Sequence, residues 1–140
     1  MSNTQEVGNS TDLQEAFPVV DPGALPLGAR VLVQMRLPKK KMTASGIILA
    51  EETRDTEKAQ TPIGKVVAIG PLAFKKRDTM EPWPEGTWAQ VGDYVRVPRW
   101  TGDRWEVKID KDTNVEFMLM NDHEVVAKLT CDPLTMRAFV

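Results

Sequence analysis

Residues 30–36, Arg-Val-Leu-Val-Gln-Met-Arg, alternate between apolar and polar side chains and decide the fold class. In an extended chain, alternate side chains point to opposite faces, so this pattern separates an apolar face from a polar one. The apolar face holds Val31, Val33 and Met35, and the other face holds mostly Arg30, Gln34 and Arg36. The pattern predicts a strand with one buried face, which Pro38 ends.

Further short apolar segments, separated by turns and loops, follow along the chain. We predict strands over residues 64–70, 93–98, 104–109, 115–120 and 124–129. Gly102 supplies the tight bend of a predicted hairpin between the second and third of these strands. Residues 71–90 are rich in proline and read as an excursion without regular structure. Since the body has no segment of ten or more residues with helical periodicity, the fold class is all-β, a barrel or a sandwich.

The composition excludes many classes of protein. The chain has 140 residues, with 41% hydrophobic and 27% charged residues, which suits one globular domain with tails. The sequence shows neither a signal peptide nor an apolar run long enough for a membrane span, so we expect a cytoplasmic protein. With one cysteine and one histidine, it can form no internal disulfide, no cysteine-clustered zinc site and no site that needs two imidazoles.

Both ends of the chain differ from its body. Residues 1–23 are polar and acidic, with no Lys or Arg, and read as a flexible extension. Thr11-Asp-Leu-Gln14 fits a capping box, which predicts a short helix at residues 11–17 of this extension. Residues 130–140 show no clear period and form a C-terminal tail. The rest of the chain is nearly neutral and lacks the basic footprint of a nucleic-acid-binding protein.

The reactive side chains do not form a catalytic set. His123 lies between Asp122 and Glu124, but neighbouring residues on a turn point apart, and no serine or cysteine stands in a nucleophile motif. We therefore interpret His123 as a surface residue and the lone Cys131 as inert. No phosphate-binding loop or metal-ligand spacing is present, so the sequence predicts neither an enzyme nor a metal site.

Four tryptophans leave an alternative open. Trp83, Trp88, Trp100 and Trp105 are interleaved with basic residues, among them Arg99 and Arg104. A monomeric β-barrel could stack single-stranded nucleic acid on such residues. Tryptophans in small β-proteins are more often core or interface anchors, and the near-neutral body also disfavours this alternative.

An aliphatic triplet, Ile47-Ile48-Leu49, stands in the polar and basic stretch 39–62. It is either the second strand of the barrel or an exposed anchor for a hydrophobic groove on a partner. Gly46, directly before it, would let the chain turn. These residues alone do not separate the two readings.

Five pieces in order resemble the GroES-like co-chaperonins. They are Leu25-Pro-Leu-Gly-Ala-Arg-Val-Leu-Val33, Ser45-Gly-Ile-Ile-Leu49, Gly64-Lys-Val-Val-Ala-Ile-Gly70, Val91-Gly-Asp-Tyr-Val95 and Val125-Val-Ala-Lys-Leu129. The chain departs from the family pattern at Ala29, where an acidic residue is usual, and at Ser45, where a first glycine is common. Such departures, with the unusual tryptophans and prolines of residues 71–90, look more like a bacteriophage-encoded version.

The resemblance implies a small β-barrel over residues 24–129, with a mobile loop at about 36–61 and a roof hairpin at about 71–90. It implies a seven-membered ring that caps an ATP-dependent chaperonin and closes a chamber around unfolded protein cargo, in the cytoplasm of the cell or of a phage host. Gly46, Ile47, Ile48 and Leu49 would bind the chaperonin rim, and Lys75, Lys76, Arg77 and Trp83 would face the chamber. Such a protein is no enzyme and needs no cofactor, because the chaperonin uses the ATP.

Overall fold

Short antiparallel strands make up most of the regular structure. A computed structural model of the chain describes residues 13–37, 62–99 and 101–136. Its strands are β1 (Arg30–Met35), β2 (Ile63–Ile69), β3 (Tyr94–Arg96), β4 (Asp103–Lys108), β5 (Asn114–Asn121) and β6 (Ala127–Lys128). A 3-10 helix, η1 (Asp122–Glu124), follows β5, and residues 13–16 form one helical turn. None of the helical segments in these ranges has the length and apolar character of a membrane span.

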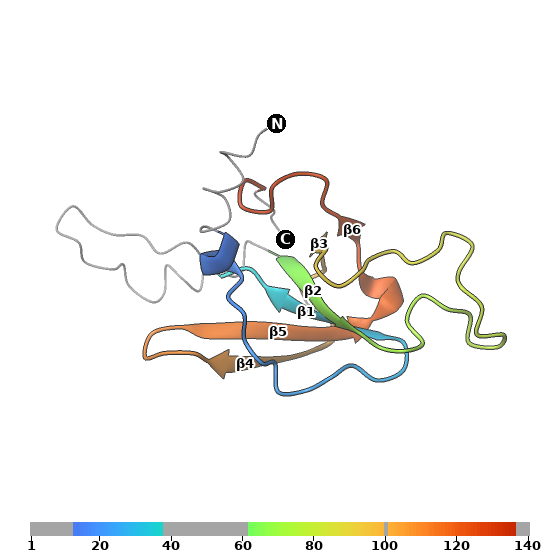
Figure 1. The fold of residues 1–140 in the computed structure, drawn as a ribbon, viewed down its shortest axis with the longest axis horizontal. Coiled ribbons are helices and arrows are strands. Elements are labelled where there is room, and N and C mark those ends of the chain that lie inside the picture. The colour runs from blue at the N-terminus through green and yellow to red at the C-terminus, as the bar shows by residue number, and fades with distance from the viewer. Residues whose placement is uncertain (1–12, 38–61, 100, 137–140) are drawn as a thin grey trace.

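The strands form one six-stranded sheet in the order β4-β5-β1-β2-β3-β6 (Figure 1). Every neighbouring pair is antiparallel. β1 lies in the middle, with Val31 opposite Ile69 of β2 on one side and Met120 of β5 on the other. The all-β prediction is confirmed, and the strands begin and end close to their predicted positions. β6 is shorter than predicted because η1 occupies the beginning of that segment.

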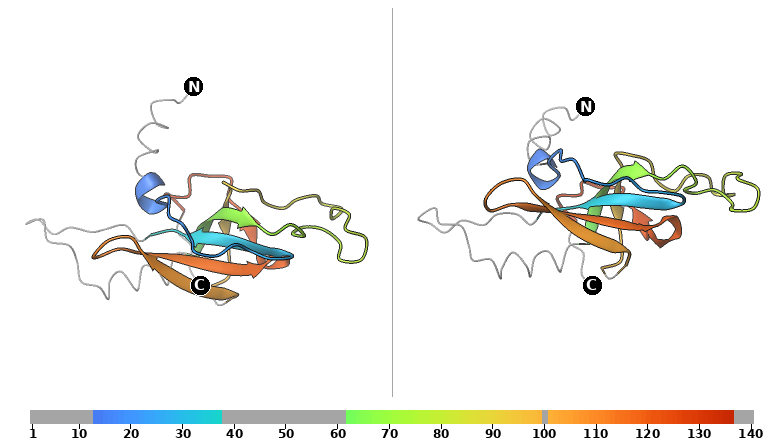
Figure 2. Two further views of the ribbon diagram at one scale, coloured as in Figure 1. Left: turned by 60° about the horizontal axis from the view of Figure 1, so that its bottom comes forward. Right: turned by 90° about the horizontal axis from the view of Figure 1, so that it is seen from below.

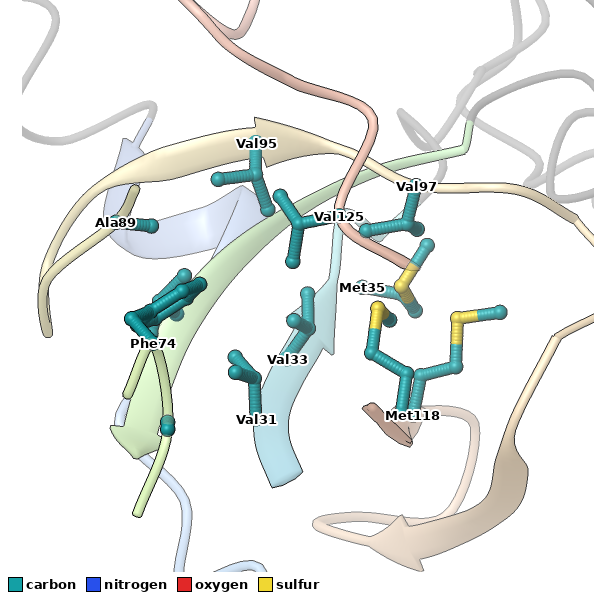
Figure 3. Packing of buried hydrophobic residues seen from close by; sticks show 12 residues of the cluster. Val31, Val33, Met35, Phe74, Ala89, Val95, Val97, Met118 and Val125 are labelled. Atoms are coloured by element: carbon teal, nitrogen blue, oxygen red, sulfur yellow. The ribbon is translucent and has the colours of Figure 1, made fainter. Parts of the chain in front are cut away.

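The sheet curls around a shared core. Val95 of β3 and Met118 of β5 belong to the same buried cluster, although β1 and β2 separate their strands in the sheet. Figure 3 shows side chains of this cluster converging from several strands. The views in Figure 2 show the strong twist that brings them together. This curl gives the sheet its barrel shape and confirms the predicted small β-barrel.

The prediction of a hairpin at Gly102 is wrong. β3 pairs with β2 and β6, whereas β4 pairs with β5, so the two strands that Gly102 was expected to join are not neighbours. The chain instead crosses from one side of the curled sheet to the other. Gly102 is needed there for a different reason: its φ is +69°, and a Cβ would lie 2.1 Å from the carbonyl oxygen of Leu119.

β1 is buried on both faces, not on one as its alternation predicted. Gln34 is only 3% exposed, and Leu32 is fully buried in a second cluster with Val115 and Phe117. Residues 18–22 supply part of the cover. The side-chain amide of Gln34 donates a 2.7 Å hydrogen bond to the carbonyl of Pro18, and Val20 packs on the second cluster.

The acidic N-terminal segment was predicted to be flexible, and from Leu13 onward it instead packs on the barrel. Phe17 is 4% exposed and contacts the buried Ile63. The indole of Trp105 donates a 2.7 Å hydrogen bond to the carbonyl of Pro22. The polar composition did not predict this contact. One buried aromatic ring and a few backbone carbonyls are enough to hold such a segment in place.

Candidate functional site

The predicted anchor, Gly46-Ile47-Ile48-Leu49, lies outside the described residues, as does all of segment 38–61. What the structure shows is how this segment leaves and re-enters the barrel. The amide of Arg36 donates a 2.8 Å hydrogen bond to the carbonyl of Ile63. The amide of Val97 donates to the carbonyl of Pro62 at 3.0 Å. We call Arg36, Leu37, Pro62 and Ile63 the stem.

A small apolar cluster surrounds the stem. Phe17 and Ile63 form its buried centre, and the Phe17 ring lies 5.1 Å from that of Tyr94, centroid to centroid. Residues from both ends of the chain complete the cluster: Leu13, Ala16, Leu129 and Met136. This stem cluster is separate from the main core and lies where segment 38–61 meets the sheet.

Arg36 connects the stem to the C-terminal tail. Its guanidinium donates hydrogen bonds to the carbonyl of Pro133 and, at 2.9 Å, to the carbonyl of Met136. Partial burial lowers the pKa of Arg36 from its ordinary value. The sequence pattern had placed this residue with the solvent-facing side chains of its strand, and only its partners in the fold reveal the second role.

The roof segment, residues 71–90, projects from the sheet and contains a hairpin (Figure 1). The amide of Lys76 donates to the carbonyl of Glu81 at 2.7 Å, and the amide of Trp83 donates to the carbonyl of Phe74 at 3.1 Å. Lys75, Lys76 and Arg77 are exposed.

Trp83 is not a free surface residue. Its ring packs edge-on against Phe74 at 5.5 Å and against Trp88 at 4.7 Å, centroid to centroid. Phe74 is 1% exposed and joins this aromatic group to the main core. Trp83 therefore serves mainly to hold the roof segment on the barrel, and only its remaining exposed surface is available to another molecule.

Sequence reasoning missed Asp122, which fastens the roof segment to the barrel. Its side chain is buried, and one carboxylate oxygen accepts a 2.8 Å hydrogen bond from the amide of Phe74. The other accepts from the amide of His123 at 2.8 Å. The Phe74 amide is buried and therefore needs such a partner, and Phe74 also has φ of +60°, a conformation that disfavours ordinary side chains. The one signal in the sequence for this role was the position of an acidic residue between two apolar strands.

The aromatic platform of the nucleic-acid alternative is not formed by Trp105 and Arg104. Trp105 stacks on Phe117, with 6.1 Å between ring centroids, and its N–H is already bonded to Pro22. Arg104 forms an ion pair with Glu116 at 2.6 Å. Trp100 lies outside the described residues. Of the side chains that would stack bases and bind phosphates, Trp105 and Arg104 are thus engaged within the barrel.

His123 also fails to form a catalytic site. Its ring is exposed, with Nδ1 3.6 Å from a carboxylate oxygen of Asp122. Within residues 13–37, 62–99 and 101–136, no three His, Cys, Asp or Glu side chains are arranged to hold a metal ion. Glu124 instead stabilises the local fold. It accepts hydrogen bonds from the Thr101 hydroxyl and the Asn121 amide, which lower the pKa of its carboxyl group.

Comparison with known families decides between a co-chaperonin and a β-barrel that binds nucleic acid. A family model described as the chaperonin 10 Kd subunit matches residues 24–129, which is the whole barrel from before β1 to just after β6. The chain belongs to this family. Its members are co-chaperonins, which assist a chaperonin and are not enzymes.

Individual relatives agree with the family assignment. The co-chaperonin GroES of Syntrophomonas wolfei is 30% identical over 104 residues, which are 74% of this chain and 95% of the relative. Co-chaperonin GroES 5 of Rhizobium meliloti is 31% identical over 101 residues, 72% of this chain and 84% of the relative. The co-chaperonin GroES of Caulobacter vibrioides is 32% identical over 101 residues, 72% of this chain and 91% of the relative. Residues 1–23 and 130–140 lie outside the match to the chaperonin 10 family.

Proposed function

We propose that this protein forms a ring that caps a GroEL-type chaperonin in the cytoplasm and closes its chamber around unfolded protein. The single observation that carries the proposal is the family match over residues 24–129, together with relatives named co-chaperonin GroES. The protein would bind no nucleotide itself, since the chaperonin uses the ATP. Trp105 and Arg104 contact other residues of the barrel, so they do not support the alternative function of binding nucleic acid.

Ile47, Ile48 and Leu49 are the proposed contacts with the chaperonin, with Gly46 allowing the chain to turn before them. Burying one aliphatic side chain contributes about 1.5–3 kcal/mol at most. Ordering each residue of the loop opposes binding by about 1–2 kcal/mol. A single loop should therefore bind weakly, and several loops presented by one ring bind tightly through their high effective concentration.

The described surface favours assembly with further copies. β4 and β6 are the outer strands of the sheet order, and β6 has only two residues. Leu25, Leu27 and Val126 are large apolar side chains that are 74%, 72% and 61% exposed. Contacts between copies in a ring would cover such residues, and a seven-membered ring is the assembly that we propose.

The roof segment would then line the top of the chamber. Lys75, Lys76 and Arg77 are exposed on its hairpin, and they would face the enclosed cargo in the proposed ring. Trp83 would support this hairpin from below through its contacts with Phe74 and Trp88.

The proposal is tested by mixing the purified protein with a bacterial chaperonin and measuring the mass of the complex with and without ATP or ADP. A nucleotide-dependent gain equal to one ring of subunits supports capping and gives the ring size. A protein that remains a monomer and adds no mass contradicts the proposal. A preformed ring that adds no mass indicates a different, dedicated chaperonin, to be tested in the same way.

The anchor is tested separately with Ile48→Ser. We expect this variant to lose chaperonin binding while its ring mass and melting temperature stay unchanged. Ile109→Ser is the matched control, because Ile109 is 40% exposed just after β4 and belongs to neither the anchor nor the stem. Normal binding by Ile48→Ser would show that the anchor is assigned to the wrong residues.

A further inference from the structure

The two ends of the chain that lie outside the family match converge on the stem. Residues 13–18 reach it from the N-terminal side through Ala16 and Phe17, and residues 132–136 reach it from the C-terminal side through Pro133 and Met136. Figure 1 shows the helical turn of residues 13–16 beside the end of β1, where segment 38–61 begins. These contacts are additional to the β1–β2 pairing that joins the two sides of the stem.

The N-terminal side holds the stem through its backbone and through one ring. The amide of Leu37, the last described residue before segment 38–61, donates a 3.0 Å hydrogen bond to the carbonyl of Ala16. Phe17 covers Ile63, the second described residue after that segment. One short piece of chain thus contacts both sides of the stem.

The C-terminal side holds the stem through Arg36 and Tyr94. A turn at residues 132–135, closed by the Thr135 amide on the Asp132 carbonyl, presents the carbonyls that Arg36 binds. Asp132 also lies close enough to Tyr94 to matter electrostatically: burial first, and then this carboxylate, raise the pKa of the Tyr94 phenol. The tail is therefore hydrogen-bonded to the stem at Arg36, and its Met136 packs on the stem cluster.

We propose that residues 13–18 and 132–136 form a terminal clamp that fixes the stem and thereby positions the chaperonin-binding loop of each subunit. The inference rests on the proposed function. Its physical basis is entropic: a loop whose ends are already ordered loses less conformational freedom on binding than one whose ends fray. Phe17 and Arg36 are the positioning residues, one for each side of the clamp.

The clamp is tested with Phe17→Ala and Arg36→Met in the full-length protein. Hydrogen exchange of the Arg36 and Leu37 amides is measured first, in the absence of chaperonin, and we expect it to accelerate in both variants. Affinity for the chaperonin, measured with ATP or ADP, should weaken by at least about tenfold, because freeing roughly one backbone residue costs each loop about one tenfold step in Kd and several loops of a ring bind together.

Three controls separate positioning from general loss of stability. Val19→Ala changes a fully exposed residue next to the clamp, and Arg30→Met removes an equal charge at the exposed start of β1. Both should behave like the wild type. Met120→Ala destabilises the core opposite Val31, at the other end of β1, and should lower the melting temperature without weakening the affinity.

Each outcome has one meaning. Faster exchange and weaker binding in both clamp variants, with normal controls, support the clamp. Unchanged exchange, or unchanged affinity beside a wild type that binds, overturns the clamp and leaves the proposed function standing. Equal weakening by Met120→Ala assigns the effect to stability and also overturns the clamp. If the wild type remains a monomer and binds no chaperonin, the proposed function is wrong and the positioning role falls with it.

Discussion

Replacing Asp122 by alanine should release the roof segment from the barrel. The Asp122 carboxylate is the acceptor for the buried amide of Phe74, at 2.8 Å, and for the amide of His123 at the same distance. Alanine removes both bonds. It leaves the Phe74 amide without its acceptor, while the backbone there still has to hold φ at +60°.

The magnitude follows from these two bonds. A buried donor that loses its acceptor costs about 1–3 kcal/mol, and the second, less buried bond adds about 1 kcal/mol. We therefore expect Asp122→Ala to lower the free energy of unfolding by about 2–4 kcal/mol. Asp122→Asn keeps one acceptor oxygen and replaces the other by an NH2 donor, so it can retain only one of the two bonds and should cost less than alanine, about 1–2 kcal/mol.

The assay is urea unfolding followed by tryptophan fluorescence, at one protein concentration for all variants because assembly also affects stability. Trp83 and Trp88 lie against Phe74 and should report the release directly. Asp78→Ala, an exposed acidic residue on the same roof segment, is the control. An Asp122→Ala variant within about 0.5 kcal/mol of the wild type would refute the role assigned to this carboxylate.

Two further predictions concern single residues of the barrel and roof. Met80 is 53% exposed and has φ of +62°. Met80→Gly should relieve backbone strain and raise the free energy of unfolding by up to about 1 kcal/mol, whereas Met80→Val should lower it. Urea unfolding of both variants measures the change, and a loss of stability with glycine would contradict the prediction. Hydrogen bonds lower the pKa of Glu124 from its ordinary value of 4.5, so its contribution is complete above about pH 4.5 and is lost as the pH falls through the lower folded value. Stability measured from pH 7 downward should therefore fall less steeply for Glu124→Gln than for the wild type, and parallel curves would show that Glu124 contributes nothing to acid sensitivity.

The fold class and the order of the strands along the chain follow from local patterns of residues. Alternation at residues 30–36 has the period of an extended chain, and the apolar segments after it are short and bounded by turn residues, which favours strands over helices. The same patterns carried the resemblance to the co-chaperonin family, and the match over residues 24–129 confirmed it. Periodicity is a local property of the chain, so the strands could be predicted from neighbouring residues alone.

Tertiary structure alone decided which strands are neighbours and which polar residues are buried. Gly102 indicated a bend, but whether the strands beside it pair depends on the curl of the whole sheet. Gln34 and Arg36 read as solvent-facing because their partners, Pro18 and the carbonyls of the C-terminal turn, are distant in sequence. Burial of a polar side chain requires such a partner, and a pattern of neighbouring residues carries no information about one that arrives from the other end of the chain.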